Sequence, residues 1–209
     1  MTRKSVSFAV LGLTIVALLA VAATGCSSAD RSLSAGDSSV RVLLTDAPSD
    51  IIADAEVTIS AVLLVPGSGE DDSDAVALLG PGDGPRVFDL MDLHNGLSAL
   101  LAERIVPAGN YSQLRLIVDQ ASVTLVDGTT FRDGSSTREL TVPSGAQTGI
   151  KVRLDEPIEA DEDMVTIVVV DFDVDNSFVL QGNPDTPSGL QGVSFTPVLR
   201  EFSRSEEPM

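Results

Sequence analysis

The chain is poor in the residues from which most catalytic, metal-binding and nucleic-acid-binding sites are built. Its 209 residues include no tryptophan, one tyrosine, one histidine and one cysteine, and 13 basic residues stand against 31 acidic ones. The net charge of −18 repels nucleic-acid phosphates, so we expect no nucleic-acid partner. Few aromatic rings are present to line a sugar-binding site, and the lone cysteine has no partner for a disulfide within the chain.

The sequence also lacks the motifs of nucleophilic and phosphate chemistry. It contains no Gly-x-Ser-x-Gly segment and no Walker-type phosphate loop. His94 is the only histidine, and one imidazole makes a poor transition-metal site, so a loop histidine is the simpler interpretation. A hydrolase that uses two paired carboxylates stays open, because any two acids of so acidic a chain can meet in the fold.

The N-terminus has the layout of a cleaved secretory leader. Two basic residues precede an uncharged, mostly apolar run over residues 6–21, and small residues follow up to Cys26. The run is short for a membrane-spanning helix and is followed directly by a processing site, which favours a signal peptide over residues 1–25. Residues 21–26 resemble the bacterial lipobox, with Thr24 where that motif more often has Ala or Ser. An ordinary signal peptide with a stray cysteine, or a marginal transmembrane helix, are the alternatives.

The position of Cys26 as the only thiol fits a lipid-modified N-terminus, because acylation uses that thiol. Each buried methylene adds about 0.8 kcal/mol, so two or three acyl chains anchor a protein stably where one does not. We therefore expect a lipoprotein held to a membrane through Cys26, in the cell envelope outside the cytoplasm, at the outer membrane or cell surface. Residues 26–39 predict a flexible tether to a single domain over residues 40–203, with a disordered tail at 204–209.

The rest of the chain is a succession of β-branched and aliphatic runs separated by Gly, Pro and Asp clusters. This pattern predicts a mainly β fold, an antiparallel β-sandwich of immunoglobulin-like or prealbumin-like type with one short helix. Within residues 55–65 we expect strict alternation, with Val57, Ile59, Ala61 and Leu63 on one face. The predicted strands cover residues 40–45, 55–65, 75–79, 111–118, 122–126, 129–132, 138–142, 149–154, 164–174 and 193–202.

Local signals position the connections. Leucines at spacings of three and four predict the helix over residues 97–104, and Asp127-Gly128 predicts a hairpin turn. Pro197 removes a backbone donor, which places the last strand at an edge of its sheet. Tyr111 follows a turn, where its hydroxyl can pin that turn as in a tyrosine corner, or its ring simply packs.

Three aspartates, Asp171, Asp173 and Asp175, alternate at the end of the strongest apolar run. A strand period of two puts them on one face, where like charges about 7 Å apart need to be offset. Calcium prefers carboxylate and carbonyl oxygens, so these residues form a candidate calcium site, which Asp46 or Asp50 from a neighbouring turn can complete. The spacing matches the opening of an EF-hand, but the glycine and the final glutamate of that loop are missing. A solvated acidic strand end is the alternative.

A small-residue segment after Pro143 is a second candidate site. Ser144 and Gly145 lie in a stretch without bulky side chains, where a ligand can approach the backbone closely. Such a stretch is also typical of an ordinary connection between strands.

Four segments, taken together and in their order, resemble the family called domain of unknown function 4382. They are Leu-Leu-Thr-Asp-Ala-Pro at 43–48, Ile-Val-Pro-Ala-Gly-Asn-Tyr-Ser-Gln-Leu-Arg-Leu at 105–116, Val-Pro-Ser-Gly-Ala-Gln-Thr-Gly-Ile-Lys at 142–151 and Asp-Phe-Asp-Val-Asp-Asn-Ser at 171–177. The resemblance covers residues 40–200. It implies a β-rich domain on secreted or lipid-anchored bacterial and archaeal proteins, with no established activity and no catalytic residues to carry over. The family's recurring Asp-x-Asp and Pro-Ser-Gly segments point to Asp171, Asp173, Ser144 and Gly145.

These observations predict a lipid-anchored extracytoplasmic binding or structural module with no catalytic activity of its own. Its partners are expected to be the membrane, through lipid on Cys26, and a protein or polysaccharide. Calcium-dependent surface adhesion or glycan binding is one alternative, and a carboxylate-based hydrolase is another. Calcium is the one candidate cofactor.

Overall fold

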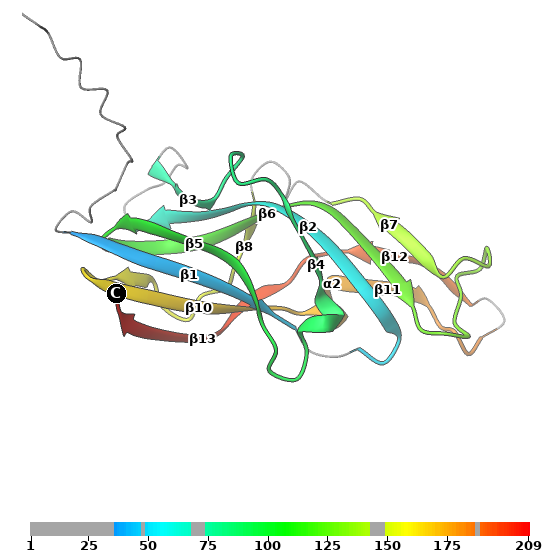
Figure 1. Cartoon of the computed structure of the whole chain (residues 1–209). Coiled ribbons are helices and arrows are strands. Elements are labelled where there is room, and N and C mark those ends of the chain that lie inside the picture. The colour runs from blue at the N-terminus through cyan, green and yellow to red at the C-terminus, as the bar shows by residue number, and fades with distance from the viewer. Residues whose placement is uncertain (1–35, 47–48, 68–73, 143–148, 187–188) are drawn as a thin grey trace, which may run out of the picture. The chain divides into compact units, whose positions relative to one another are not determined.

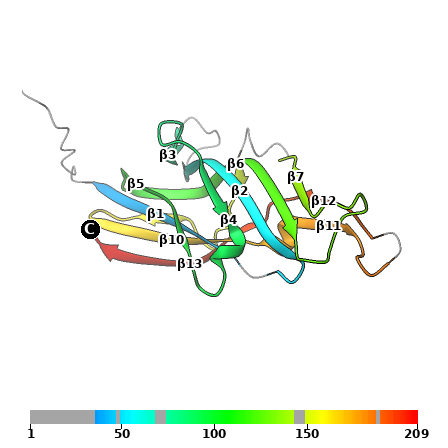
Figure 2. The same ribbon diagram turned by 45° about the vertical axis from the view of Figure 1, so that its right-hand side comes forward.

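The computed structural model describes residues 36–46, 49–67, 74–142, 149–186 and 189–209. These residues all belong to one unit of the chain, Leu33–Met209. Within this unit the strands form two main sheets and a separate two-stranded hairpin (Figures 1 and 2).

The first sheet has four strands in the order β13-β10-β1-β5. They are β13 (Leu199–Pro208), β10 (Met164–Phe172), β1 (Asp37–Thr45) and β5 (Ala99–Pro107). β1 pairs with β10 in parallel, whereas the two outer pairs are antiparallel. The sheet is therefore mixed, which local sequence patterns do not predict, because β1 and β10 lie far apart in the chain.

The second sheet is built on the long antiparallel pair β2 (Ile52–Pro66) and β6 (Gly109–Leu125). Shorter strands flank this pair: β3 (Val76–Leu79), β4 (Arg86–Asp89), β7 (Thr137–Leu140), β8 (Ile150–Lys151) and β9 (Ile158–Ala160). β3 and β4 pair with β2, and the other three pair with β6. The separate hairpin consists of β11 (Phe178–Gly182) and β12 (Leu190–Phe195).

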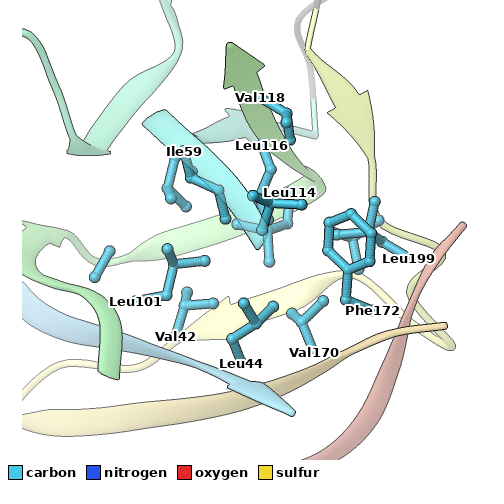
Figure 3. Packing of buried hydrophobic residues seen from close by; sticks show 14 of the residues in the cluster. Val42, Leu44, Ile59, Leu101, Leu114, Leu116, Val118, Val170, Phe172 and Leu199 are labelled. Carbon is cyan, nitrogen blue, oxygen red and sulfur yellow. The ribbon is translucent and has the colours of Figure 1, made fainter. Parts of the chain in front are cut away.

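The two sheets bury their apolar faces in one shared core. Alternate residues of β1 and β10 are completely buried: Val40, Val42, Leu44, Val168, Val170 and Phe172. The second sheet contributes Ile59, Leu114, Leu116 and Val118, which are also completely buried (Figure 3). Full burial of such a side chain contributes about 1.5–3 kcal/mol, so this core holds the layers together. The prediction of a mainly β, sandwich-type fold is confirmed.

The set of alternate residues that faces the core switches near the middle of both β2 and β6. In β2 the buried positions are odd-numbered over residues 55–59 and even-numbered at 62 and 64. The pairing of the two strands skips Ser60 on β2 and Asp119 on β6, and the Ser60 hydroxyl donates to Asp119 Oδ1 at 2.8 Å. The strict alternation predicted over residues 55–65 is therefore wrong beyond Ile59, because paired bulges shift the phase of both strands.

The predicted helix over residues 97–104 is wrong. Most of that segment lies in β5, where the pairing with β1 skips Leu101, and Leu101 and Ala102 are both buried. This bulge adds one residue to the strand period, so apolar residues recur at spacings that mimic a helix. The helices of the described residues lie elsewhere: the 3-10 helix η2 (Leu90–Leu93) and the single-turn α2 (Val174–Ser177).

The C-terminal segment forms a strand rather than the disordered tail predicted at 204–209. β13 continues to Pro208 and pairs with β10 along its length. Its Ser, Arg and Glu residues are typical of a solvated tail, but the ladder with β10 satisfies its backbone. β13 is an edge strand, as predicted, although Pro197 itself lies in the connection that precedes it.

The turn at Asp127-Gly128 is present, and Gly128 has a φ of 86° that favours glycine. The strand that returns along β6 is β7, not the predicted residues 129–132. Phe131 in that stretch is buried in a small second core with Leu125 and Leu190 instead.

Candidate functional site

A polar cluster lies where β10 ends. Asp171 of β10 is buried, and Arg200 of β13 lies directly opposite in the ladder. The guanidinium donates to Asp171 Oδ2 from Nε at 2.8 Å and from Nη2 at 2.7 Å. A buried carboxylate is costly unless it is paired and hydrogen-bonded. The charge of Asp171 is therefore balanced by an arginine of the same sheet.

Asp173 caps α2. Its Oδ1 accepts a hydrogen bond from the backbone N–H of Asn176 at 3.1 Å, and its Oδ2 accepts one from Asn176 Nδ2 at 2.8 Å. Capping satisfies a first-turn N–H that has no partner within the helix. Asp175 follows inside the helix and is exposed. The prediction that Asp171, Asp173 and Asp175 share one strand face is wrong, because β10 ends at Phe172 and the chain turns into α2.

The end of β1 joins the same cluster. Asp46 is buried, and its Oδ1 accepts a hydrogen bond from the backbone N–H of Val174 at 3.1 Å. The Thr45 hydroxyl lies 3.0 Å from the carbonyl oxygen of Leu93 and 2.8 Å from that of Leu97. The cluster therefore ties β1, η2, α2 and the strands of the first sheet together at one end.

Across the described residues, no group of three or more His, Cys, Asp and Glu side chains is placed to hold a metal ion. The described residues include every predicted calcium ligand: Asp46, Asp50, Asp171, Asp173 and Asp175. The calcium site stays a prediction. Arg200 Nη2 lies 2.7 Å from Asp171 Oδ2 and 3.8 Å from Asp173 Oδ2, so an arginine is the cation beside these two carboxylates, while Asp46 Oδ1 accepts from a backbone N–H.

A shallow hollow on the outer face of the second sheet is lined by acids that the sequence analysis did not single out. Glu56, Ser122 and Glu139 follow one another across β2, β6 and β7, and Asp119 of the β6 bulge lies beside them. No Lys or Arg is among the residues that line it. The only signal in the sequence is the outward position of each acid in an alternating strand, which says nothing about proximity across the sheet.

Tyr111 pins the turn before its strand. Its side chain is buried, and its hydroxyl donates to the carbonyl oxygen of Pro107 at 2.8 Å. Burial raises the pKa of the Tyr111 hydroxyl above its ordinary value of 10.0. The tyrosine-corner interpretation is confirmed.

His94 ends η2. One ring nitrogen, Nδ1, contacts the carbonyl oxygen of Met91, so the imidazole closes the turn from which it projects. This placement agrees with a loop histidine.

Three predicted positions lie outside the described residues. They are Cys26, together with the leader and most of the tether, and the candidate ligand residues Ser144 and Gly145. They stay predictions.

The comparison with protein families decides which family this fold represents. The model of the family described as "Domain of unknown function (DUF4382)" matches residues 37–186. The chain belongs to this family. No curated protein and no solved structure matches it.

The DUF4382 match begins at β1 and ends before β12 and β13. These two last strands nevertheless belong to the same fold, because β13 pairs along β10 and because Phe195 and Leu199 are buried in the main core. Arg200, the partner of Asp171, also lies beyond the match. In the described part of this DUF4382 protein, no helix is long and apolar enough to cross a membrane.

Proposed function

We propose that the chain is a lipid-anchored extracytoplasmic module that binds or supports other envelope components and has no catalytic activity of its own. The observation that carries the proposal is the position of Cys26. The only cysteine of 209 residues directly follows an apolar run and a set of small residues. That arrangement is typical of a lipoprotein precursor.

The folded body supports a binding or structural role. Its core is closed and apolar, and its buried polar side chains at the end of β10 bind one another and the backbone. The single histidine closes its own turn through a contact between Nδ1 and the carbonyl oxygen of Met91, and the sequence has no Gly-x-Ser-x-Gly segment. A module of this kind works through its surface and loops rather than through a buried reactive group.

The net charge of the chain supports a folded body that is surrounded by solvent and does not lie on the membrane surface. With 31 acidic and 13 basic residues, the protein is repelled by anionic surfaces rather than adsorbed to them. An acyl anchor followed by a tether rich in Ser, Asp and Gly holds such a body near a membrane without requiring contact with it.

Labelling with radioactive palmitate in the native host tests the anchor. Wild type and a Ser27→Ala control should incorporate label and fractionate with membranes, whereas Cys26→Ser should do neither. An unlabelled wild type contradicts the proposal.

A separate assay tests the absence of catalysis. The purified full chain should give no turnover of glycosidase or esterase substrates. Turnover that one Asp or Glu substitution abolishes, with folding intact, contradicts this part of the proposal and supports a carboxylate-based hydrolase.

A further inference from the structure

The loop between η2 and β5 contains Asn95-Gly96, the only place in the chain where a glycine follows an asparagine. Asn95 has a φ of 58° and Gly96 a φ of 81°, and the backbone N–H of Leu97 donates to the carbonyl oxygen of His94 at 3.2 Å. Two central residues with positive φ are typical of a type I′ turn, for which Asn-Gly is a preferred pair. The loop projects away from the strands in Figures 1 and 2.

The Asn95-Gly96 turn is accessible to water. Both residues are exposed, and a Cβ at Gly96 would meet no atom within 4 Å. Among the described residues, no hydrogen bond is found to the Asn95 side chain or to the backbone N–H of Gly96. The turn is closed by the hydrogen bond between His94 and Leu97, so the Gly96 nitrogen can approach the Asn95 side chain when that bond opens.

The other three asparagines of the chain are held differently. Asn176 donates from Nδ2 to Asp173 Oδ2 at 2.8 Å, and the N–H of the next residue, Ser177, donates to the carbonyl oxygen of Asp173 at 2.9 Å. Asn183 is followed by a proline, whose nitrogen carries no hydrogen. Asn110 lies in the ladder between β6 and β9, and a buried tyrosine follows it. Only Asn95 therefore combines an exposed side chain with an unhindered and unbound neighbouring N–H among these residues.

We infer that Asn95 is a site of spontaneous deamidation, in which the backbone nitrogen of Gly96 is the nucleophile and water is the second reactant. The Gly96 nitrogen forms a bond to Asn95 Cγ, the bond between Cγ and Nδ2 breaks, and ammonia leaves with the proton of the Gly96 N–H. The product is a succinimide ring. Water then opens the ring at one of its two carbonyl carbons. Attack at Cγ gives aspartate, and attack at the backbone carbonyl carbon gives isoaspartate, whose main chain runs through Cγ.

Isoaspartate at position 95 would alter the connection between η2 and β5. It adds a methylene to the main chain and a negative charge beside His94. The carbonyl oxygen of Leu97 accepts a hydrogen bond from the Thr45 hydroxyl at 2.8 Å, so a longer turn displaces a group that is bound to the end of β1. The reaction is independent of the proposed anchor, because both reacting residues belong to the folded body.

Incubation of the purified full chain in water enriched in a heavy oxygen isotope tests the inference. After incubation at mildly alkaline pH, the protein is digested in ordinary water, and mass spectrometry with electron-transfer fragmentation identifies the products. Residue 95 should gain one heavy oxygen and be found as both isoaspartate and aspartate, while Asn110, Asn176 and Asn183 keep their amides over the same period. The rate should rise with pH, because the Gly96 nitrogen must lose its proton to react.

Two variants locate the nucleophile. Gly96→Ala should react several-fold more slowly than wild type, since a methyl group beside the nitrogen hinders its attack. Gly82→Ala is the matched control, because Gly82 is also exposed and a Cβ there likewise meets no atom within 4 Å. That variant should deamidate at the wild-type rate, and thermal melting should show that both variants are folded.

An Asn95 amide that survives as long as the amides of Asn110 and Asn176 overturns the inference. Equal rates in wild type and folded Gly96→Ala also overturn it. If Gly96→Ala does not fold, the products of the wild type still decide the route. Aspartate without isoaspartate would then contradict it, because direct hydrolysis of the side chain gives aspartate alone.

Discussion

Arg200 and Asp171 are direct cross-strand neighbours, and two nitrogens of the guanidinium converge on one oxygen of a carboxylate that is buried in the sheet. Arg200 itself is 54% exposed along its side chain, so it balances the buried charge from the solvent side. The pair joins the edge strand β13 to the centre of the first sheet. Arg200 also lies beyond the end of the family match, at a position where the sequence alone gives no reason to expect a partner for Asp171.

Replacing Arg200 by Gln should destabilise the fold. The change leaves the buried Asp171 carboxylate without its cation, which costs about 1–3 kcal/mol in free energy of unfolding. Urea denaturation followed by circular dichroism measures the effect. Arg132→Gln is the matched control, since Arg132 is exposed and no ion pair is found for it among the described residues. Equal stability of the two variants would mean that the pair contributes nothing.

Tyr111→Phe should remove the hydrogen bond to Pro107 and leave the ring in place. The expected loss is about 1 kcal/mol in free energy of unfolding, without a change in secondary structure. A variant as stable as wild type would show that the ring alone secures the turn.

The ionisation of Tyr111 can be followed directly, because it is the only tyrosine and the chain has no tryptophan. Burial raises its pKa, so phenolate absorbance of the native protein should appear at higher pH than in denaturant. The raised pKa means that the native state retains the proton more tightly. The contribution of Tyr111 to the free energy of unfolding is therefore present in full below pH 10.0, the ordinary pKa. It is lost as the pH rises from there through the pKa of the native state. Coincident titrations in the two states would contradict burial of the hydroxyl.

Gly182→Ala should be strongly destabilising. Gly182 has a φ of 103°, and a Cβ at this position would lie 2.4 Å from the carbonyl oxygen of Gly189. The clash and the backbone strain should together cost more than about 2 kcal/mol. Gly109→Ala is the control, because no atom lies within 4 Å of its Cβ position. Thermal melting of the two variants should separate them clearly, and similar melting temperatures would contradict the β11–β12 geometry.

Asp133 should contribute stability at neutral pH that is lost in acid. Arg138 donates to its Oδ2 at 2.6 Å and Ser135 binds its Oδ1, and these hydrogen bonds lower the pKa of Asp133 from 3.8 to about 2. Because the pKa is lowered in the native state, the contribution of Asp133 to the free energy of unfolding is present in full above the ordinary pKa of 3.8. It is lost as the pH falls towards about 2. Asp133→Asn should therefore show a shallower loss of stability than wild type over this range.

The fold class was predictable because its determinants are local. β-branched runs separated by Gly, Pro and Asp specify strands and turns, and Tyr111 after Pro107 specified a pinned turn that the structure contains. Two errors, the helix over residues 97–104 and the alternation over residues 55–65, come from one cause, which is an extra residue in a strand. The bulge at Leu101 changed a strand period into an apparent helix, and the paired bulges at Ser60 and Asp119 moved the buried face of β2.

The candidate site was less predictable because its partners are distant in sequence. Asp171, Asp173 and Asp175 form a regular pattern only while the chain stays extended, and it does not beyond Phe172. Arg200 and Asp46 reach these residues through strand pairing, including the parallel pair of β1 and β10 that no local signal encodes. The acids of the outer hollow likewise meet only across a ladder.

The central claim is that lipid on Cys26 holds this β-sandwich outside the cytoplasm. Mass spectrometry of the N-terminal peptide from protein extracted from native membranes tests it most directly. The account predicts a chain that begins at Cys26 and carries a thioether-linked lipid. A chain that retains residues 1–25 and a free Cys26 thiol would contradict it.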